Sequence, residues 1–362
     1  MQRHTIYILF LCLLFTSCDD MYDVERPVID IDTTANYRVA VLCEGLFNMN
    51  NSTLAYYDAP SNTIDYNIFK EKNGRGLGDT ANDMKLYGDR LFVIVNVSSQ
   101  LEIIDTATFV SVKQIPFFNE DGRARQPRFI EFYEDNAYVS CFDGMVARLN
   151  LNTLEITGWV RCGRNPDNIA VANGKLYVSN SGGLDKPNYD TTVSVVDLRS
   201  FTEIKRIEVG VNPGAIASDS EGDVYVVTRG DYENTASSTY AFHKIDTEID
   251  EVMRTFEGLH PLSLKIVNDI AYMYSYDFTS QAQWIKTFDC LTERVVNDNF
   301  IADGTELHTP FGIDIDARTG NVYICEAYDF VLWGDVLCFD RNGILRYRIN
   351  EIGLNPNHVI AL

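Results

Sequence analysis

Residues 165–210, NPDNIAVANGKLYVSNSGGLDKPNYDTTVSVVDLRSFTEIKRIEVG, contain the clearest strand pattern of the chain. Apolar residues are concentrated in 167–172, 175–180, 192–197 and 203–209, which predicts four short strands. The dipeptide Asn173-Gly174 separates the first two segments, and it favours a tight hairpin because both residues accept a positive φ. The stretch therefore predicts a unit of four antiparallel strands.

The same unit recurs along the chain. An Asp or Asn ends each third strand, and its side chain is expected to accept a hydrogen bond from the backbone N–H two residues on. These corner residues are Asp58, Asp105, Asn150, Asp197, Asp246, Asp289 and Asp340, at intervals of 43 to 51 residues. Seven units of this kind predict an all-β fold, a seven-bladed β-propeller with four antiparallel strands per blade.

The end of the chain predicts how the ring closes. Residues 355–362 match residues 165–172 in pattern, so they read as an inner strand with no blade after it. The first repeat, which begins at Tyr37, has no clear inner strand of its own. We expect the C-terminal strand to join the N-terminal blade, because this closure removes open sheet edges that invite aggregation.

The first 36 residues are expected to lie outside the propeller. Arg3 and a brief apolar run, followed by Thr16-Ser17-Cys18, predict a signal peptide over 1–17, too short for a transmembrane helix. The segment resembles the lipobox of bacterial lipoproteins, which implies lipidation of Cys18; the alternative is an ordinary signal peptide that contains a Cys. Residues 18–36 read as an acidic tether, and 37–362 as the propeller. The acidic cluster after Cys18 resembles a surface-export signal; the alternative is a solvated linker.

Charge excludes one class of partner. The net charge is −22, and removal of Arg3 with the signal makes the mature chain more negative still. Nucleic-acid binding needs a basic surface, so we expect no nucleic-acid partner. Contact with a membrane is expected through the lipid anchor alone.

The cysteines of the propeller leave two possibilities open. They are Cys43, Cys141, Cys162, Cys290, Cys325 and Cys338. An even count in an exported protein permits disulfides. However, Cys43 and Cys325 occupy equivalent places in apolar strands, which favours buried free thiols. The spacings fit no zinc site, so no metal is predicted.

One face of the ring is predicted to carry the function. The loops between second and third strands share this face with the connections from each outer strand to the next inner strand. They are long and rich in aromatic and amide groups: Phe47, Asn48, Asn50, Tyr189, Tyr232, Asn234, Tyr276, Phe278, Trp284, Tyr328, Phe330 and Trp333. Such groups suit a large, semi-polar ligand. The alternative is that these loops are simply solvated.

Basic residues and histidines are also predicted on this face. Four arginines could bind a phosphate or pair locally with Asp143, Asp167 or Asp231: Arg125, Arg128, Arg164 and Arg229. His260 and His308 fall at blade openings, where each could ligate a metal in a cofactor or bond a neighbouring loop.

We take fourteen residues as candidate ligand-binding residues: Phe47, Asn48, Asn96, Arg128, Asp143, Arg164, Asn180, Tyr189, Arg229, Tyr232, Tyr276, Phe278, Tyr328 and Trp333. The sequence contains no Gly-x-Ser-x-Gly elbow and no HExxH motif. We therefore expect no enzymatic activity, no catalytic residue and no cofactor.

The repeat elements carry a family resemblance. Asn-Pro openings, Leu176-Tyr177-Val178, Val195-Val196-Asp197 and Ile207-Glu208-Val209-Gly210 resemble the YVTN-type seven-bladed propellers over 37–362. In architecture the chain is also similar to surface lipoproteins of gut anaerobes that capture cobalamin (vitamin B12). That resemblance implies a cobalamin or related corrinoid as the transported ligand, a TonB-dependent outer-membrane importer as partner, and a lipid-anchored place at the outer-membrane surface. The alternatives are a glycan-binding or protein-docking propeller, or a lactonase- or lyase-type enzyme.

Overall fold

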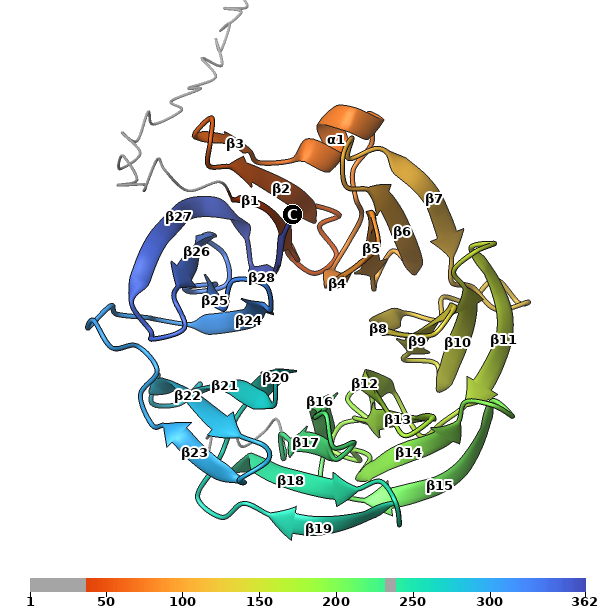
Figure 1. The fold of residues 1–362 in the computed structure, drawn as a ribbon. Coiled ribbons are helices and arrows are strands. Elements are labelled where there is room, and N and C mark those ends of the chain that lie inside the picture. The colour runs from red at the N-terminus through yellow and green to blue at the C-terminus, as the bar shows by residue number, and fades with distance from the viewer. Residues whose placement is uncertain (1–36, 232–238) are drawn as a thin grey trace, which may run out of the picture.

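The chain folds into a ring of seven four-stranded antiparallel sheets (Figure 1). The computed structural model describes residues 37–231 and 239–362. From inner to outer strand, blades 1 to 4 are β28 (Pro356–Ala361), β1 (Arg38–Cys43), β2 (Thr53–Asp58), β3 (Thr63–Asp65); β4 (Ala81–Tyr87), β5 (Arg90–Val95), β6 (Gln100–Asp105), β7 (Ser111–Pro116); β8 (Pro127–Tyr133), β9 (Asn136–Cys141), β10 (Met145–Asn150), β11 (Glu155–Arg161); and β12 (Pro166–Ala172), β13 (Lys175–Asn180), β14 (Thr192–Asp197), β15 (Thr202–Glu208). Blades 5 to 7 are β16 (Pro213–Ser218), β17 (Val224–Thr228), β18 (Ala241–Asp246), β19 (Glu251–Thr255); β20 (Ser263–Val267), β21 (Ile270–Tyr276), β22 (Gln283–Asp289), β23 (Arg294–Asn297); and β24 (Pro310–Asp316), β25 (Asn321–Glu326), β26 (Trp333–Phe339), β27 (Leu345–Leu354). The predicted fold class is confirmed.

A short helix, α1 (Ile68–Asn73), connects blade 1 to blade 2, and the sequence analysis did not predict it. The Asn67 side chain accepts a hydrogen bond from the Lys70 N–H at 3.2 Å, which caps the helix start. Gly74 ends the helix with a φ of 66°. No helix in the described part of the chain is long and apolar enough to cross a membrane.

The turns agree with the repeat and correct one detail. Asn173 and Gly174 have φ values of 48° and 71°, as the predicted hairpin requires. At the corners, the bonded N–H often lies three residues on rather than two. Asn150 Oδ1 accepts from both Asn152 and Thr153, at 3.0 and 2.9 Å. The corner side chain therefore accepts hydrogen bonds from two backbone N–H groups of the turn, whereas a simple Asx-turn has one.

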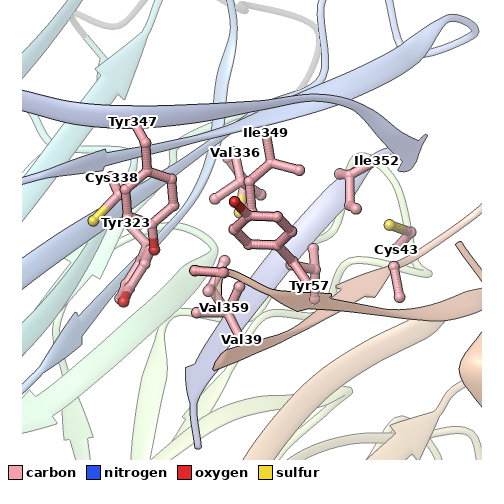
Figure 2. Close-up of a cluster of buried hydrophobic side chains, with 14 residues drawn as sticks. Val39, Cys43, Tyr57, Tyr323, Val336, Cys338, Tyr347, Ile349, Ile352 and Val359 are labelled. Atoms are coloured by element: carbon pink, nitrogen blue, oxygen red, sulfur yellow. The ribbon is translucent and has the colours of Figure 1, made fainter. Parts of the chain in front are cut away.

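The C-terminal strand closes the ring as predicted. β28 pairs antiparallel with β1, so the two ends of the chain share blade 1. Figure 2 shows the buried cluster that joins this blade to blade 7: Tyr57 and Val359 belong to blade 1, and Tyr323 and Ile349 to blade 7. Asp314 in β24 also accepts a hydrogen bond from the Val359 N–H at 2.9 Å. The closing strand is therefore bonded to its own blade and to the preceding one.

Neighbouring blades are further connected by side chains that bond to backbone carbonyl groups near the axis. Asn357 donates to the carbonyl of Ala81 at 2.9 Å, from blade 1 to blade 2. Equivalent bonds from other blades run from Asn82 to Arg128, from Ser179 to Gly214 and from Tyr274 to Phe311. Each bond gives a backbone carbonyl near the axis a hydrogen-bond donor from a side chain.

All six cysteines of the propeller are buried with free thiols, as the equivalent placement of two of them favoured. Burial raises the pKa of the thiols of Cys43, Cys162, Cys290 and Cys338 to about 12. They act as small apolar side chains within and between the sheets.

Gly312 tests the contact between blade 7 and the closing strand. A Cβ at this position would lie 2.2 Å from the backbone oxygen of Asn357, whereas one at Gly76 would meet nothing within 4 Å. We expect Gly312→Ala to lower the free energy of unfolding by about 3 kcal/mol, because the two strands must separate. Gly76→Ala, the matched control, should change it by less than about 0.5 kcal/mol. Urea denaturation measures both, and equal stabilities of the two variants would contradict the expectation.

Candidate ligand-binding face and axial cavity

The start of the inner strand is what directs side chains to the axis. In six of the seven inner strands, all but β20, the register shifts just after the opening residue, as in β12 between Pro166 and Ile169. Such a bulge holds an extra residue that has no partner in the ladder. Asn165 and Asn212, which precede the opening prolines of β12 and β16, have positive φ values that Asn tolerates. Bulge residues from different blades, among them Asn82, Arg128 and Phe311, line one cavity.

A cavity of about 310 Å³ opens where these bulges meet the loop-rich face. Four candidate residues line it: Arg128, Arg229, Tyr276 and Phe278. Other residues that line the cavity were not predicted from the sequence, among them Glu44, Asn82, Phe311 and Asn357. Their position directly beside the blade openings or after a second strand was the signal that could have identified them.

The two arginines of the cavity share one carboxylate. Asp167, which is almost fully buried, accepts from Arg128 Nε and Arg229 Nη2, each at 3.1 Å. The Arg128 guanidinium also lies 4.5 Å from the centre of the Phe142 ring. Of the two interpretations left open, pairing with a neighbouring carboxylate is therefore present, and it fixes both guanidinium groups at the cavity wall.

Aromatic side chains from blades 6 and 7 form the other side of the cavity. Tyr276 and Phe278 meet edge to face with ring centroids 4.9 Å apart, and Phe278 stacks on Phe330 at 6.2 Å. Two further hollows, of about 710 and 670 Å³, adjoin this region; Tyr276 and Tyr328 line one, and Tyr328 and Trp333 the other. Phe278 and Trp333 remain 47% and 43% exposed, so apolar ring surface is open to a ligand.

At the base of the cavity, charged side chains from four inner strands form a network of ion pairs. The His358 ring nitrogens lie 3.2 Å from Asp314 and 3.4 Å from Asp83. Lys265 lies 3.4 Å from Asp314. Burial alone would raise the pKa of Asp314, but Lys265 and His358 outweigh it and lower that pKa. Because the folded pKa is depressed, Asp314 stabilises the fold at neutral pH and loses this effect as the pH falls below about 4.

Other candidate residues lie away from this cavity. Asn96 donates to the carbonyl of Pro127 at 2.9 Å, and Asn180 bonds Thr192 and Ser194, so both amides connect backbone or strand elements. Asp143 pairs with Arg125. Arg164 pairs with Asp185 and donates to the carbonyl of Tyr189, whose side chain is buried.

The remaining candidates are exposed or outside the described residues. Phe47 is 71% exposed, and the Asn48 N–H donates to Asp79 at 3.1 Å. Tyr232 and Cys18, the predicted lipidation site, lie outside the described residues. His260 Nδ1 lies 2.5 Å from the carbonyl oxygen of Tyr240, and His308 lines one of the adjoining hollows. Among residues 37–231 and 239–362, no group of three or more His, Cys, Asp or Glu side chains is arranged to hold a metal.

The contribution of Asp167 to holding Arg128 and Arg229 can be tested by removing its charge. Asp167→Asn leaves two partly buried guanidinium groups without their carboxylate, so we expect the free energy of unfolding to fall by about 3 kcal/mol. Asp185→Asn removes a solvent-exposed partner of Arg164 and should cost less than about 1 kcal/mol. Chemical denaturation compares the two variants. If Asp167→Asn lowers the free energy of unfolding no more than Asp185→Asn does, Asp167 does not hold the two arginines in place.

Glu326 at the end of β25 gives a dependence on pH. Its carboxylate accepts from the N–H groups of His308 and Thr309 at 2.6 and 2.9 Å, and burial raises its pKa above 4.5. The folded state therefore keeps this proton to higher pH than the unfolded state, and stability falls as pH rises from 4.5 through the folded pKa. Glu326→Gln keeps an acceptor and removes the charge.

We compare the free energy of unfolding of Glu326→Gln with that of the natural protein. The difference should favour the variant more at about pH 8, where Glu326 is ionised, than at about pH 4. Urea denaturation at both pH values measures the difference. A stability difference that is the same at both would contradict the expected burial of a charge at this position.

Comparisons with known proteins agree on the fold. The structure is similar to that of a quinonprotein alcohol dehydrogenase-like protein from Bacteroides thetaiotaomicron. The match covers 90% of this chain and 78% of the other, with 14% sequence identity and a TM-score of 0.61. The match to the Kuenenia stuttgartiensis hydrazine synthase covers 70% of this chain and 74% of the other, with 13% identity and a TM-score of 0.55. The match to the computationally designed Ika8 protein covers 88% of each chain, with 11% identity and a TM-score of 0.53. At these identities the likeness concerns the fold alone.

No curated protein matches this sequence. A family model does match residues 38–345, which is nearly the whole propeller, under the description "Domain of unknown function (DUF5074)". The chain therefore belongs to the DUF5074 family.

Proposed function

We propose that this protein is a lipid-anchored surface protein that captures cobalamin or a related corrinoid on its loop-rich face. The observation that supports this most directly is the group of accessible aromatic side chains from blades 6 and 7 beside a basic wall. A corrinoid presents a broad ring system fringed with amides, and aromatic and amide groups complement both. Its role is binding rather than catalysis.

The size of the cavity bears on how such a ligand would lie. A volume of 310 Å³ is at the lower end of pockets that enclose small molecules. A corrinoid would therefore lie across the face and over the adjoining hollows, with one substituent in the cavity. Because Tyr276, Phe278 and Phe330 already pack against one another, little conformational entropy is lost on binding, which favours high affinity.

The proposal includes delivery of the ligand. Anchorage at Cys18 would place the protein at the outer-membrane surface. The ligand would then pass to a TonB-dependent importer that docks on the same face. Surface apolar groups on the loops, including Phe47 and Trp333, are the residues that such an importer would contact.

Titration calorimetry with cyanocobalamin and the purified full-length protein in detergent tests the ligand. We expect saturable binding, and a loss of at least about tenfold in affinity for Trp333→Ala and for Tyr276→Ala. Tyr87→Ala is the matched control: Tyr87 is 39% exposed, close to the value for Trp333, but it lies in the β4–β5 hairpin on the opposite face. Its substitution should leave affinity unchanged.

Two results would overturn the corrinoid assignment. One is the absence of heat at micromolar protein together with a colourless protein peak after gel filtration. The other is an equal effect of the Tyr87 and Trp333 substitutions. Binding of a glycan or a protein by the same face, without corrinoid binding, would then identify the alternative class.

A further inference from the structure

The axial cavity has two chemically different walls. Arg128 and Arg229, from blades 3 and 5, line one side. Phe278, Phe311 and Phe330, from blades 6 and 7, line the other. A ligand that satisfies both walls must carry an anionic group and an apolar ring within a space of about 310 Å³.

The basic wall is held in place before any ligand arrives. Asp167 orients both guanidinium groups, and Arg128 Nη1 also donates to the side chain of Asn82. A Cβ on Gly214 would lie 2.3 Å from Arg229 Nε, so the glycine leaves room for this guanidinium against the inner strand. Both guanidinium groups also line the cavity, where they can form charge-assisted hydrogen bonds to an anion.

Glu44 is the acidic residue that lines the same cavity as Arg128 and Arg229. Burial raises the pKa of Glu44, although Arg128 and His358 act in the other direction. A group whose ionised form is disfavoured by burial weakens the basic wall less than an exposed carboxylate would. Lys265 and His358, which also line the cavity, are engaged by Asp314 below it.

The aromatic wall is equally well fixed. Phe311 and Phe330 meet at 78° with centroids 5.6 Å apart, and Phe330 stacks on Phe278 at 24°. The carbonyl of Phe311 accepts a hydrogen bond from the Tyr274 hydroxyl at 2.9 Å, which ties this strand to the neighbouring blade. A flat ring inserted here gains stacking or edge contacts with a surface that does not need to rearrange.

We infer that the axial cavity is a subsite for a planar aromatic group that carries a phosphate or carboxylate. The anionic group binds Arg128 and Arg229, and the ring packs on Phe278 and Phe330. This inference concerns the deep end of the face and holds for any ligand with such a group, so it does not require the ligand to be a corrinoid.

Phenyl phosphate is the probe for this subsite, with benzoate, phenol and inorganic phosphate as its parts. Saturation-transfer NMR on the full-length protein should show phenyl phosphate or benzoate binding at least about tenfold tighter than phenol or inorganic phosphate, because only the former meet both walls. Arg128→Gln should weaken phenyl phosphate binding at least about tenfold. Glu44→Gln should tighten it, since it removes the opposing charge.

Two further variants distinguish a direct effect on the subsite from a general loss of folding. Arg148→Gln is matched to Arg128→Gln: its guanidinium also lies over a ring, 4.7 Å from the centre of Phe201, but away from the cavity, and affinity should not change. Phe278→Ala truncates an exposed ring that the fold does not bury, and it should weaken phenyl phosphate while leaving inorganic phosphate unaffected.

Binding of phenyl phosphate no tighter than phenol, or unaffected by both Arg128→Gln and Phe278→Ala, would overturn the subsite. Failure of cyanocobalamin to bind would remove the proposed function and leave this result unchanged. Failure of phenyl phosphate and benzoate alone would remove the subsite and leave corrinoid binding to the outer face untouched.

Discussion

The pairing of β28 with β1 closes the ring, and the positions of the other blades follow from that closure. Every other blade is built from consecutive residues, but blade 1 takes its inner strand from the end of the chain. An unpaired β1 would expose a row of backbone groups at the axis. Because Asn357 also bonds blade 2 and Val359 bonds blade 7, the closing strand sets the spacing of three blades at once. The positions of side chains across the channel follow from that spacing.

The candidate site is a product of backbone geometry more than of the loops. Bulges at the starts of the inner strands place Arg128 and Asp167 at the axis, although they come from different blades. Tyr276 at the end of β21 and Phe278 in the loop that follows then add their rings above them. A rigid floor of charged groups and a rim of aromatic groups is an arrangement that suits recognition of ligands with a polar end and a flat apolar body.

Much of the fold could be predicted from the sequence, because hydrophobic alternation and turn residues act locally. The strands of blade 4 were predicted to within one residue at each end, and ring closure followed from the resemblance of 355–362 to 165–172. Helix α1 was missed because its single buried turn, Ile68 and Phe69, is too short to show a helical period. The shared use of Asp167 by two arginines was not predictable either, since alternation shows which side of a strand a residue occupies but not which blades meet across the axis.

The six thiols have a consequence for chemical labelling. Thiolates, not thiols, attack alkylating reagents and disulfides, and a raised pKa keeps these sulfurs protonated at physiological pH. Burial also blocks reagent access. We therefore expect these six thiols to react slowly with oxidants and in disulfide exchange while the propeller is folded. Any modification of these sulfurs in an oxidising compartment would mark molecules whose sheets have already opened.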